Sequence, residues 1–246
     1  MKKIILIAFG ILLIIGLGTC FLRDRSLSIL TENYPPLSFI QDGEITGFGT
    51  DVVHAIQQEL GTDHQIHLLS WDAAYSTALR DANIVLYTID RTPEREELFY
   101  FVGPLGSNVA SLYSLSADPL RIETLEDAKE VDTIATTTNW FTEQYLVEQR
   151  FSNLLSMVDP LHTLKLLKEG KADLAVFTDV TLPDLCREAG VDMDSLTPVY
   201  ELLSSDYYIA ISKKTDVKVK DAWQDAFEKI KENGSLDELK TKWFNH

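Results

Sequence analysis

Three side chains that can bind a charged small molecule follow one apolar segment of the sequence. Residues 84–86 (Ile-Val-Leu) predict a buried strand, and Thr88, Asp90 and Arg95 come soon after it. The guanidinium of Arg95 offers a planar, permanently charged fork that matches a carboxylate. Because Pro93 cannot continue a strand, we expect these groups at the strand's carboxyl end, where open α/β sheets bind small molecules.

A second polar group follows another apolar segment. Residues 174–177 (Leu-Ala-Val-Phe) predict a strand, with Thr178 and Asp179 at its carboxyl end. The Asp179 carboxylate could accept an ammonium group or could cap the next helix, and the residues alone leave both open. Arg95 has a similar alternative, a surface ion pair with one of the acidic residues around it, Glu94, Glu96 and Glu97.

Strands and helices alternate between these polar groups. The first cycle reads β-α-β-α-β and the second begins at Thr124, so we expect parallel strands with helical crossovers and an α/β fold. Two alternating runs, 109–115 and 207–212, predict strands that join the halves. Residues 222–243 predict two helices that must dock on the first half. The segments expected in the first cycle are strands at 27–30, 66–69 and 84–86 and helices at 51–60 and from 70 onward.

Composition and charge limit the classes of function. The chain has 246 residues and a formal net charge of −16. This acidic charge argues against a nucleic-acid partner, because phosphate binding needs a basic face. The five histidines are scattered with no metal-ligand spacing, so we expect no metal site and no nucleophilic triad. We expect a monomer without a cofactor.

The N-terminus predicts export. Lys2 and Lys3 precede an apolar run over residues 4–17, and this run is short for a membrane-spanning helix. Residues 1–19 therefore predict a signal peptide, and Leu17 with Cys20 resembles a bacterial lipoprotein signal in which Cys20 is lipidated and becomes the new N-terminus. An uncleaved anchor or ordinary signal cleavage is the alternative. We expect a periplasmic or cell-surface protein tethered to the membrane at its N-terminus.

The mature part of the chain resembles the bacterial extracellular solute-binding proteins, family 3, which are type II periplasmic binding proteins of ABC importers. The resemblance implies two α/β lobes, each a mostly parallel sheet flanked by helices, joined by two hinge crossings, with a ligand clamped between them. It places lobe 1 at 26–110 plus 213–246 and lobe 2 at 111–212. The motifs that carry it are Tyr34-Pro35-Pro36-Leu37-Ser38-Phe39, Gly47-Phe48-Gly49-Thr50-Asp51, Thr88 to Arg95, Gly170-Lys171-Ala172-Asp173 and Asn233-Gly234-Ser235-Leu236 with Lys242-Trp243-Phe244.

The resemblance also implies roles for single residues. Arg95 matches the arginine that receives the ligand's α-carboxylate, and Asp179 matches the aspartate that accepts its ammonium group. Tyr34 and Trp71 match two aromatic positions that enclose the ligand's side chain, although either ring could instead belong to the core. Thr88 lies in the same ligand-binding motif as Arg95.

Two departures from the family pattern concern the expected ligand contacts. Asp90 stands where a serine or threonine usually binds the ligand carboxylate, and a second carboxylate there repels an anion unless it pairs with Arg91 or Arg95. The segment from Thr136 to Trp140 lacks the glycine that lets main-chain amides approach the ligand, which leaves Thr138 and Trp140 as the expected contacts there.

The resemblance implies a binding protein without catalytic residues. It would capture a small polar metabolite, an amino acid or a related compound, by hinge closure and deliver it to an ABC permease. Two alternatives stay open, since a fold does not fix a function. One is an exported dehydratase with Asp90 as its acid, and the other is a ligand-sensing module that acts through a membrane sensor.

Overall fold

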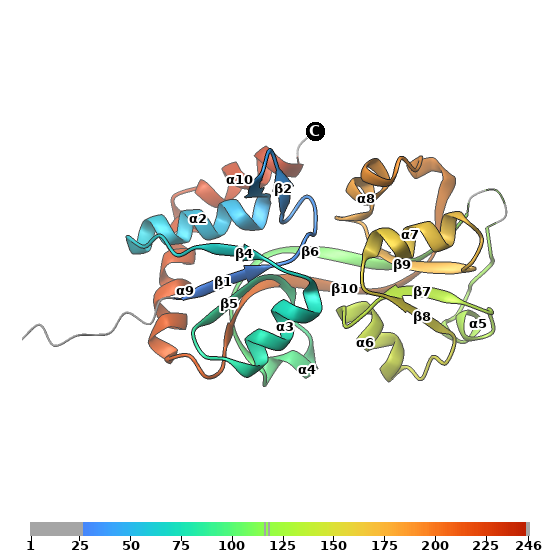
Figure 1. Cartoon of the computed structure of the whole chain (residues 1–246), viewed down its shortest axis with the longest axis horizontal. Helices are drawn as coiled ribbons and strands as arrows, with labels where there is room; N and C mark the ends of the chain where they lie inside the picture. Colours follow the sequence, from blue (N-terminus) through green and yellow to red (C-terminus); the bar gives the residue numbers. More distant parts are fainter. Residues whose placement is uncertain (1–26, 116, 118, 245–246) are drawn as a thin grey trace, which may run out of the picture.

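The computed structural model describes residues 27–115, 117 and 119–244. The predicted signal peptide and Cys20 lie outside these residues. Eight strands form one sheet in the order β4-β1-β5-β10-β6-β9-β7-β8, and this sheet runs through two lobes that lie side by side in Figure 1. The expected α/β fold with two lobes is confirmed.

The first lobe is built on three parallel strands. β1 pairs with β4 on one side and with β5 on the other, as the β-α-β-α-β pattern predicts. In Figure 1, α2 lies above this part of the sheet, and α3 and α4 lie below it. A hairpin of β2 and β3, which the sequence pattern did not reveal, precedes α2. The elements are β1 (Ser28–Thr31), β2 (Phe39–Gln41), β3 (Glu44–Thr46), α2 (Phe48–Leu60), β4 (Ile66–Leu68), α3 (Trp71–Arg80), β5 (Ile84–Asp90) and α4 (Pro93–Glu96).

The second lobe repeats this arrangement. β7 pairs in parallel with both β8 and β9, and helices cover the two faces, with α7 and α8 above and α5 and α6 below in Figure 1. The elements are α5 (Leu125–Lys129), β7 (Ile134–Thr137), α6 (Phe141–Glu148), β8 (Leu154–Met157), α7 (Pro160–Lys168), β9 (Leu174–Thr178), α8 (Leu182–Ala189) and a 3₁₀ turn, Met193–Ser195.

Two long antiparallel strands join the lobes. β6 (Phe99–Leu115) and β10 (Leu196–Ser212) pair along their whole length, from Leu196 with Leu115 to Ser212 with Phe99. The sequence predicted strands only at 109–115 and 207–212, and these bounds are too short because the ladder continues beyond them with three register shifts. The exact lobe boundaries, 110/111 and 212/213, remain predictions.

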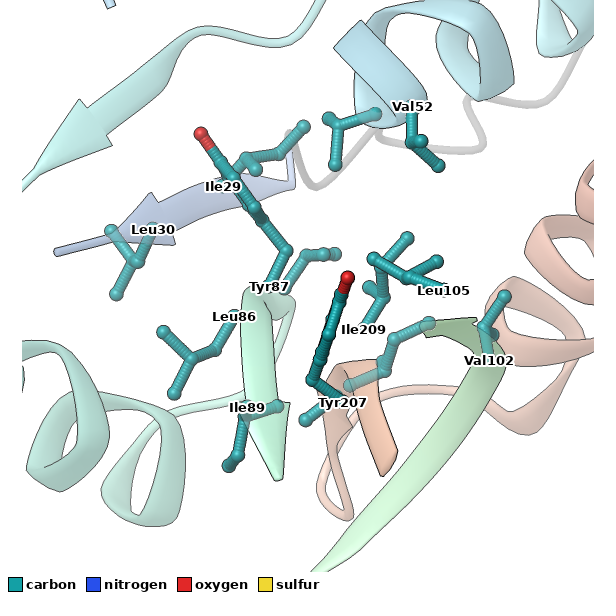
Figure 2. Packing of buried hydrophobic residues seen from close by; sticks show 14 of the residues in the cluster. Ile29, Leu30, Val52, Leu86, Tyr87, Ile89, Val102, Leu105, Tyr207 and Ile209 are labelled. Atoms are coloured by element: carbon teal, nitrogen blue, oxygen red, sulfur yellow. The ribbon is translucent and has the colours of Figure 1, made fainter. Parts of the chain in front are cut away.

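The core of the first lobe surrounds β5, whose side chains are buried on both faces of the sheet. Figure 2 shows Leu86, Tyr87 and Ile89 among apolar side chains of β1, α2, β6 and β10. The hydroxyl of Tyr87 lies 2.8 Å from Thr50 Oγ1, so its polar end is satisfied inside the core. Burial on both faces explains why β5 reads as one apolar run.

The last two helices dock on the first lobe, as predicted. α9 (Val217–Glu232) packs on α2 and β6, and α10 (Ser235–Phe244) packs on α2 and α9. Asp51 Oδ2 accepts hydrogen bonds from Lys242 Nζ and Trp243 Nε1, both at 2.7 Å. The end of the chain is therefore tied to the start of α2.

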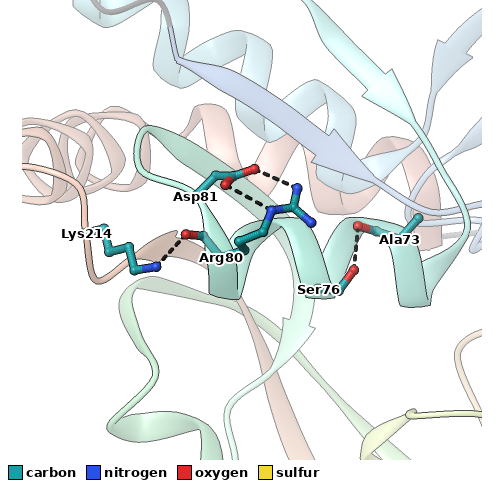
Figure 3. Close-up of polar contacts among 5 residues, drawn as sticks. All are labelled: Ala73, Ser76, Arg80, Asp81 and Lys214. Atoms are coloured by element: carbon teal, nitrogen blue, oxygen red, sulfur yellow. Dashed lines mark hydrogen bonds and ion pairs between the residues drawn. The ribbon is translucent and has the colours of Figure 1, made fainter.

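The end of α3 is held by polar contacts outside the core. Arg80 donates two hydrogen bonds to the Asp81 carboxylate, and Lys214, just after β10, donates to the main-chain carbonyl of Arg80 (Figure 3). The last carbonyls of a helix have no partner within it, so the lysine satisfies one of them. This contact connects α3 to the segment that leaves the second crossing strand.

No helix among the described residues is long and apolar enough to cross a membrane. Cys186 is buried on α8 among the apolar side chains of the second lobe.

Candidate functional site

A small cavity lies where the two lobes meet. Its volume is about 10 Å³, and both lobes line it. The first lobe contributes the end of β1 and the loop after it, the start of α3, the end of β5 and α4, whereas the second lobe contributes the start of α6. The lining residues are Glu32, Tyr34, Trp71, Thr88, Asp90, Arg95, Trp140 and Phe141.

Arg95 is built into the wall of this cavity. Its side chain is 1% exposed. One terminal nitrogen, Nη1, donates to the Asp90 carbonyl oxygen at 3.1 Å, and the other, Nη2, donates to the Asn139 carbonyl oxygen at 3.3 Å. Its guanidinium carbon lies 5.3 Å from the ring centre of Trp71 and 5.2 Å from that of Tyr75. Arg95 is therefore no surface ion pair, and its Nε remains buried without a partner.

Two buried carboxyl groups share the cavity with this arginine. Glu32 is 8% exposed and Asp90 is 5% exposed. Burial raises the pKa of Glu32 to about 8, although the Trp140 indole N–H and the charge of Arg95 act in the opposite direction. Burial also raises the pKa of Asp90 to about 6, against the hydrogen bond from Asn108 and the charge of Arg95. A cavity with such carboxyl groups exchanges protons near neutral pH.

Asp90 pairs with neither of the two arginines considered from the sequence. Arg91 pairs with Glu96, and no ion pair within 4.0 Å joins Asp90 to Arg95. Instead, Asp90 Oδ1 accepts a hydrogen bond from Asn108 Nδ2 at 2.9 Å. The amide of a crossing strand therefore holds the carboxylate in place.

Asn139 connects the lobes through residues that line the cavity. Its carbonyl oxygen accepts hydrogen bonds from Arg95 and from Trp71 Nε1, the latter at 2.8 Å, and its side-chain nitrogen donates to Asp72 Oδ1 at 2.6 Å. A φ angle of 60° lets it present both groups, and asparagine tolerates this left-handed conformation better than most residues. A single residue of the second lobe thus holds three residues of the first.

Two aromatic residues add further contacts between the lobes. The ring of Tyr34 meets that of Trp140 edge to face, with ring centres 5.0 Å apart. The Tyr34 hydroxyl lies 3.1 Å from Thr178 Oγ1 at the end of β9. The Trp140 indole N–H lies near Glu32 but reaches no acceptor in hydrogen-bond geometry. The cavity is therefore enclosed by rings from both lobes.

Thr88 has a strained backbone. Its φ angle of 62° is unusual for a β-branched residue, and its hydroxyl bonds to the Tyr87 carbonyl oxygen at 2.6 Å. A Cβ atom added at Gly49 would lie 2.5 Å from Thr88 Cγ2, so the glycine makes room for this side chain. Strained residues cluster at ligand sites, and this one lines the cavity.

The structure brings six of the predicted residues together and leaves two apart. Tyr34, Trp71, Thr88, Asp90, Arg95 and Trp140 line the cavity, but Thr138 and Asp179 do not. Thr138 is half-buried, and its main-chain N–H bonds to Met157 of β8. Asp179 is exposed, and its Oδ1 accepts a hydrogen bond from the Val109 N–H at 2.8 Å. The ligand roles of all eight residues remain predictions.

Three residues of this site were missed in the sequence. Glu32 directly follows β1, and the rule that polar groups collect at the carboxyl ends of parallel strands could have found it. Phe141 reads as an ordinary apolar residue at the start of a helix. Asn139 acts through its carbonyl oxygen and its backbone conformation, which residue types do not reveal.

A wider groove lies next to the cavity, between α4, α6 and β10, and shares Phe141 with it. Its volume is about 760 Å³, and it is open to solvent. It is lined by Arg91, which pairs with Glu96 and lies over the rings of Phe101 and Tyr208 at 5.5 and 5.6 Å. Since that arginine is already paired, the small cavity with its buried charged groups is the better candidate site.

Metal binding has little support in the described part of the chain, where no group of three His, Cys, Asp or Glu side chains could hold a metal ion. The groups that line the cavity are two carboxyls, a guanidinium and aromatic rings, which suit a charged organic solute.

Known proteins resemble this chain over nearly its whole length. The amino-acid-binding protein AabA of Dichelobacter nodosus is 26% identical, and the alignment covers 96% of this chain and 95% of the relative. A putative ABC transporter arginine-binding protein of Escherichia coli is 25% identical, with 99% of both chains covered. Among solved structures, a histidine kinase sensor domain with similarity to periplasmic binding proteins superposes with a TM-score of 0.80 at 22% identity, covering 89% of this chain and 96% of that one.

The two lobes, the paired crossing strands and the cavity between the lobes agree with the family whose sequence model matches residues 27–246. That match covers both lobes and both crossings. The chain therefore belongs to the bacterial extracellular solute-binding proteins, family 3.

Proposed function

We propose that this protein captures a small polar metabolite, an amino acid or a related compound, between its lobes outside the cytoplasm and delivers it to an ABC importer. The observation that carries the proposal is the cavity at the lobe junction, which holds a buried arginine and is lined by residues of both lobes. The names of two relatives, an amino-acid-binding protein and a putative ABC transporter arginine-binding protein, support the same class of ligand.

Arg95 would receive the ligand's carboxylate. In the structure its Nη2 holds a carbonyl oxygen of the second lobe, and a ligand carboxylate would take the place of that oxygen as the lobes separate. The lobes would then close over the bound ligand. Closure requires only that the ligand binds the closed arrangement better than the open one.

A titration with a panel of amino acids and related metabolites tests this function. We expect a thermal shift with one class of ligand and its loss in Arg95→Ala, because the carboxylate would lose its cationic partner. Arg91→Ala is the matched control, since Arg91 lies outside the cavity and pairs with Glu96. Equal binding by Arg95→Ala and by the unchanged protein would contradict the site assignment.

Export and tethering belong to the same proposal. We infer that residues 1–19 direct export and that Cys20 carries lipid, which would keep the protein beside its membrane partner. Cell fractionation of Cys20→Ala tests this, with release from the membrane as the expected result. A variant that stays in the membrane fraction would favour an uncleaved anchor instead.

We propose binding rather than catalysis. Asp90, the acid of the dehydratase alternative, is held by Asn108 of a crossing strand, and this supports a structural or recognition role. Turnover of a bound solute that is lost in Asp90→Asn would overturn this view. One structural similarity supports the alternative of a ligand-sensing module: the histidine kinase sensor domain has the same fold. A permease that stimulates ATP hydrolysis when the loaded protein is added would favour transport.

A further inference from the structure

The acidic groups that line the cavity outnumber the basic ones. Glu32 and Asp90 bring two carboxyls and Arg95 brings one guanidinium, all of them at least nine-tenths buried. Over the described residues, no nitrogen of a lysine, arginine or histidine comes within 4.0 Å of either carboxyl in an ion pair. Ionised carboxylates are stable in a buried site only when a cation pairs with them.

Arg95 cannot supply that cation to both acids. Its Nη1 and Nη2 donate to main-chain carbonyl oxygens, and the rings of Trp71 and Tyr75 lie against the guanidinium. Each terminal nitrogen keeps a second N–H, and Nε is buried without a partner. The arginine therefore offers N–H donors to an acceptor atom of a solute, and neither carboxyl has a basic side chain as an ion-pair partner.

The remaining wall suits a cation. Tyr34, Trp140 and Phe141 line the cavity beside the two carboxyls, and aromatic faces attract cations, more strongly where water is excluded. The buried Trp140 N–H has no acceptor in hydrogen-bond geometry. A solute that fits must bring an acceptor for the free N–H groups of Arg95 and Trp140 and positive charge for Glu32 and Asp90.

We propose that the cleft selects amino-acid-like solutes with a net charge of about +1, and that Glu32 and Asp90 are the residues that select them. This inference rests on the proposed function. A zwitterion brings one carboxylate for Arg95 and one ammonium group, which leaves one buried carboxylate unpaired. A second cationic group on the solute would pair with it.

The titratable groups around Glu32 favour its neutral form or its pairing with a cation. Asp90 faces it from β5 and Arg95 from α4, while Tyr34 lies in the loop next to it. The pKa of Glu32 is raised to about 8, so a proton neutralises it at neutral pH, and a bound cation would replace this proton.

The test compares solutes of equal shape and different charge. Isothermal titration calorimetry would compare L-arginine with L-citrulline, which carries a neutral urea group in place of the guanidinium. L-lysine and L-glutamate extend the series. We expect a cationic member to bind at least ~10-fold more tightly than L-citrulline, since a buried charge pair is worth more than about 1.4 kcal/mol. Glu32→Gln or Asp90→Asn should reduce that preference to about threefold or less.

Glu59→Gln is the matched control. Glu59 is exposed on α2 outside the cavity, and its change lowers the net negative charge as much as Glu32→Gln does. It should leave the preference unchanged. Equal or tighter binding of L-citrulline or L-glutamate, or a preference that survives both cavity variants, would overturn the charge selection while leaving the proposed function intact. If no amino acid binds to the folded protein, the proposed function itself is wrong.

Discussion

Asp90 at the end of β5 and Asn108 on the crossing strand β6 are joined by a hydrogen bond of 2.9 Å. Both side chains are buried, and Asp90 also lines the cavity. A group that would contact the solute is thus bound directly to a strand that connects the lobes. A charge that binds to Asp90 therefore acts on the strand that must bend when the lobes move.

Removing the amide donor should make the protein more sensitive to alkaline pH. Asn108→Ala leaves the Asp90 carboxylate without this donor, so we expect its pKa to rise further above the usual range. Stability from a raised carboxyl pKa is full below the unfolded value and is lost as pH rises through the folded value. Thermal unfolding should therefore show that Asn108→Ala lowers the free energy of unfolding by about 2 kcal/mol at pH 8 and by less at pH 5.

The double variant Asp90→Asn/Asn108→Ala serves as the control. With a neutral side chain at position 90, the loss caused by Asn108→Ala should no longer depend on pH. A pH dependence that persists in the double variant would assign the effect to another group.

Glu32→Gln should stabilise the folded protein at high pH. The pKa of Glu32 is raised to about 8, so its carboxyl favours folding below the unfolded value of 4.5 and loses this contribution as pH rises toward 8. Removing the charge should raise the free energy of unfolding at pH 8 by about 2–4 kcal/mol and change it much less at pH 5. Chemical denaturation at both pH values measures this difference, and Glu59→Gln should show no such trend.

Gly49→Ala should disturb the site through Thr88. The new Cβ would lie 2.5 Å from Thr88 Cγ2, and overpacking of this kind costs about 1–3 kcal/mol. Thr88→Ser removes that methyl group, so the double variant should regain part of the lost stability. Thermal unfolding of the two single variants and the double variant checks this coupling. A double variant whose loss equals the sum of the single losses would show that the contact is unimportant.

Asp72→Ala should shift the lobes toward an open arrangement. Asp72 accepts a hydrogen bond from the Asn139 side chain across the cleft. Losing this bond would destabilise the closed arrangement by about 1 kcal/mol and so raise the ratio of open to closed molecules about fivefold. Small-angle X-ray scattering should show a larger radius of gyration. Asp81→Ala is the control, because Asp81 contacts Arg80 within the first lobe. An unchanged radius for Asp72→Ala would show that other contacts hold the lobes together.

The fold was largely predictable because its signals are local. Apolar runs such as 84–86 and 174–177 became β5 and β9, and the helices of the tail docked on the first lobe. The continuity of β6 and β10 was not predictable, since register shifts interrupt the apolar alternation but not the hydrogen-bonded ladder.

The candidate site was predictable where side chains carry its chemistry. Arg95, Asp90 and the aromatic residues follow strands or begin helices, and they do meet at the cavity. The role of Asn139 was not predictable from the sequence, because this residue contributes a carbonyl oxygen and a left-handed φ angle. The position of Asp179 depends on how the lobes sit against each other, which no local pattern encodes.

Both connections between the lobes are neighbouring strands of one sheet, paired from Phe99 to Leu115. Lobe motion must therefore bend this two-stranded ribbon, and bending it away from its preferred shape costs elastic energy. Bulges bend a strand, so we expect the ribbon to bend at its three register shifts. Evolution could retune affinity there, by changing the elastic work of closing, while every residue that touches the solute stays the same.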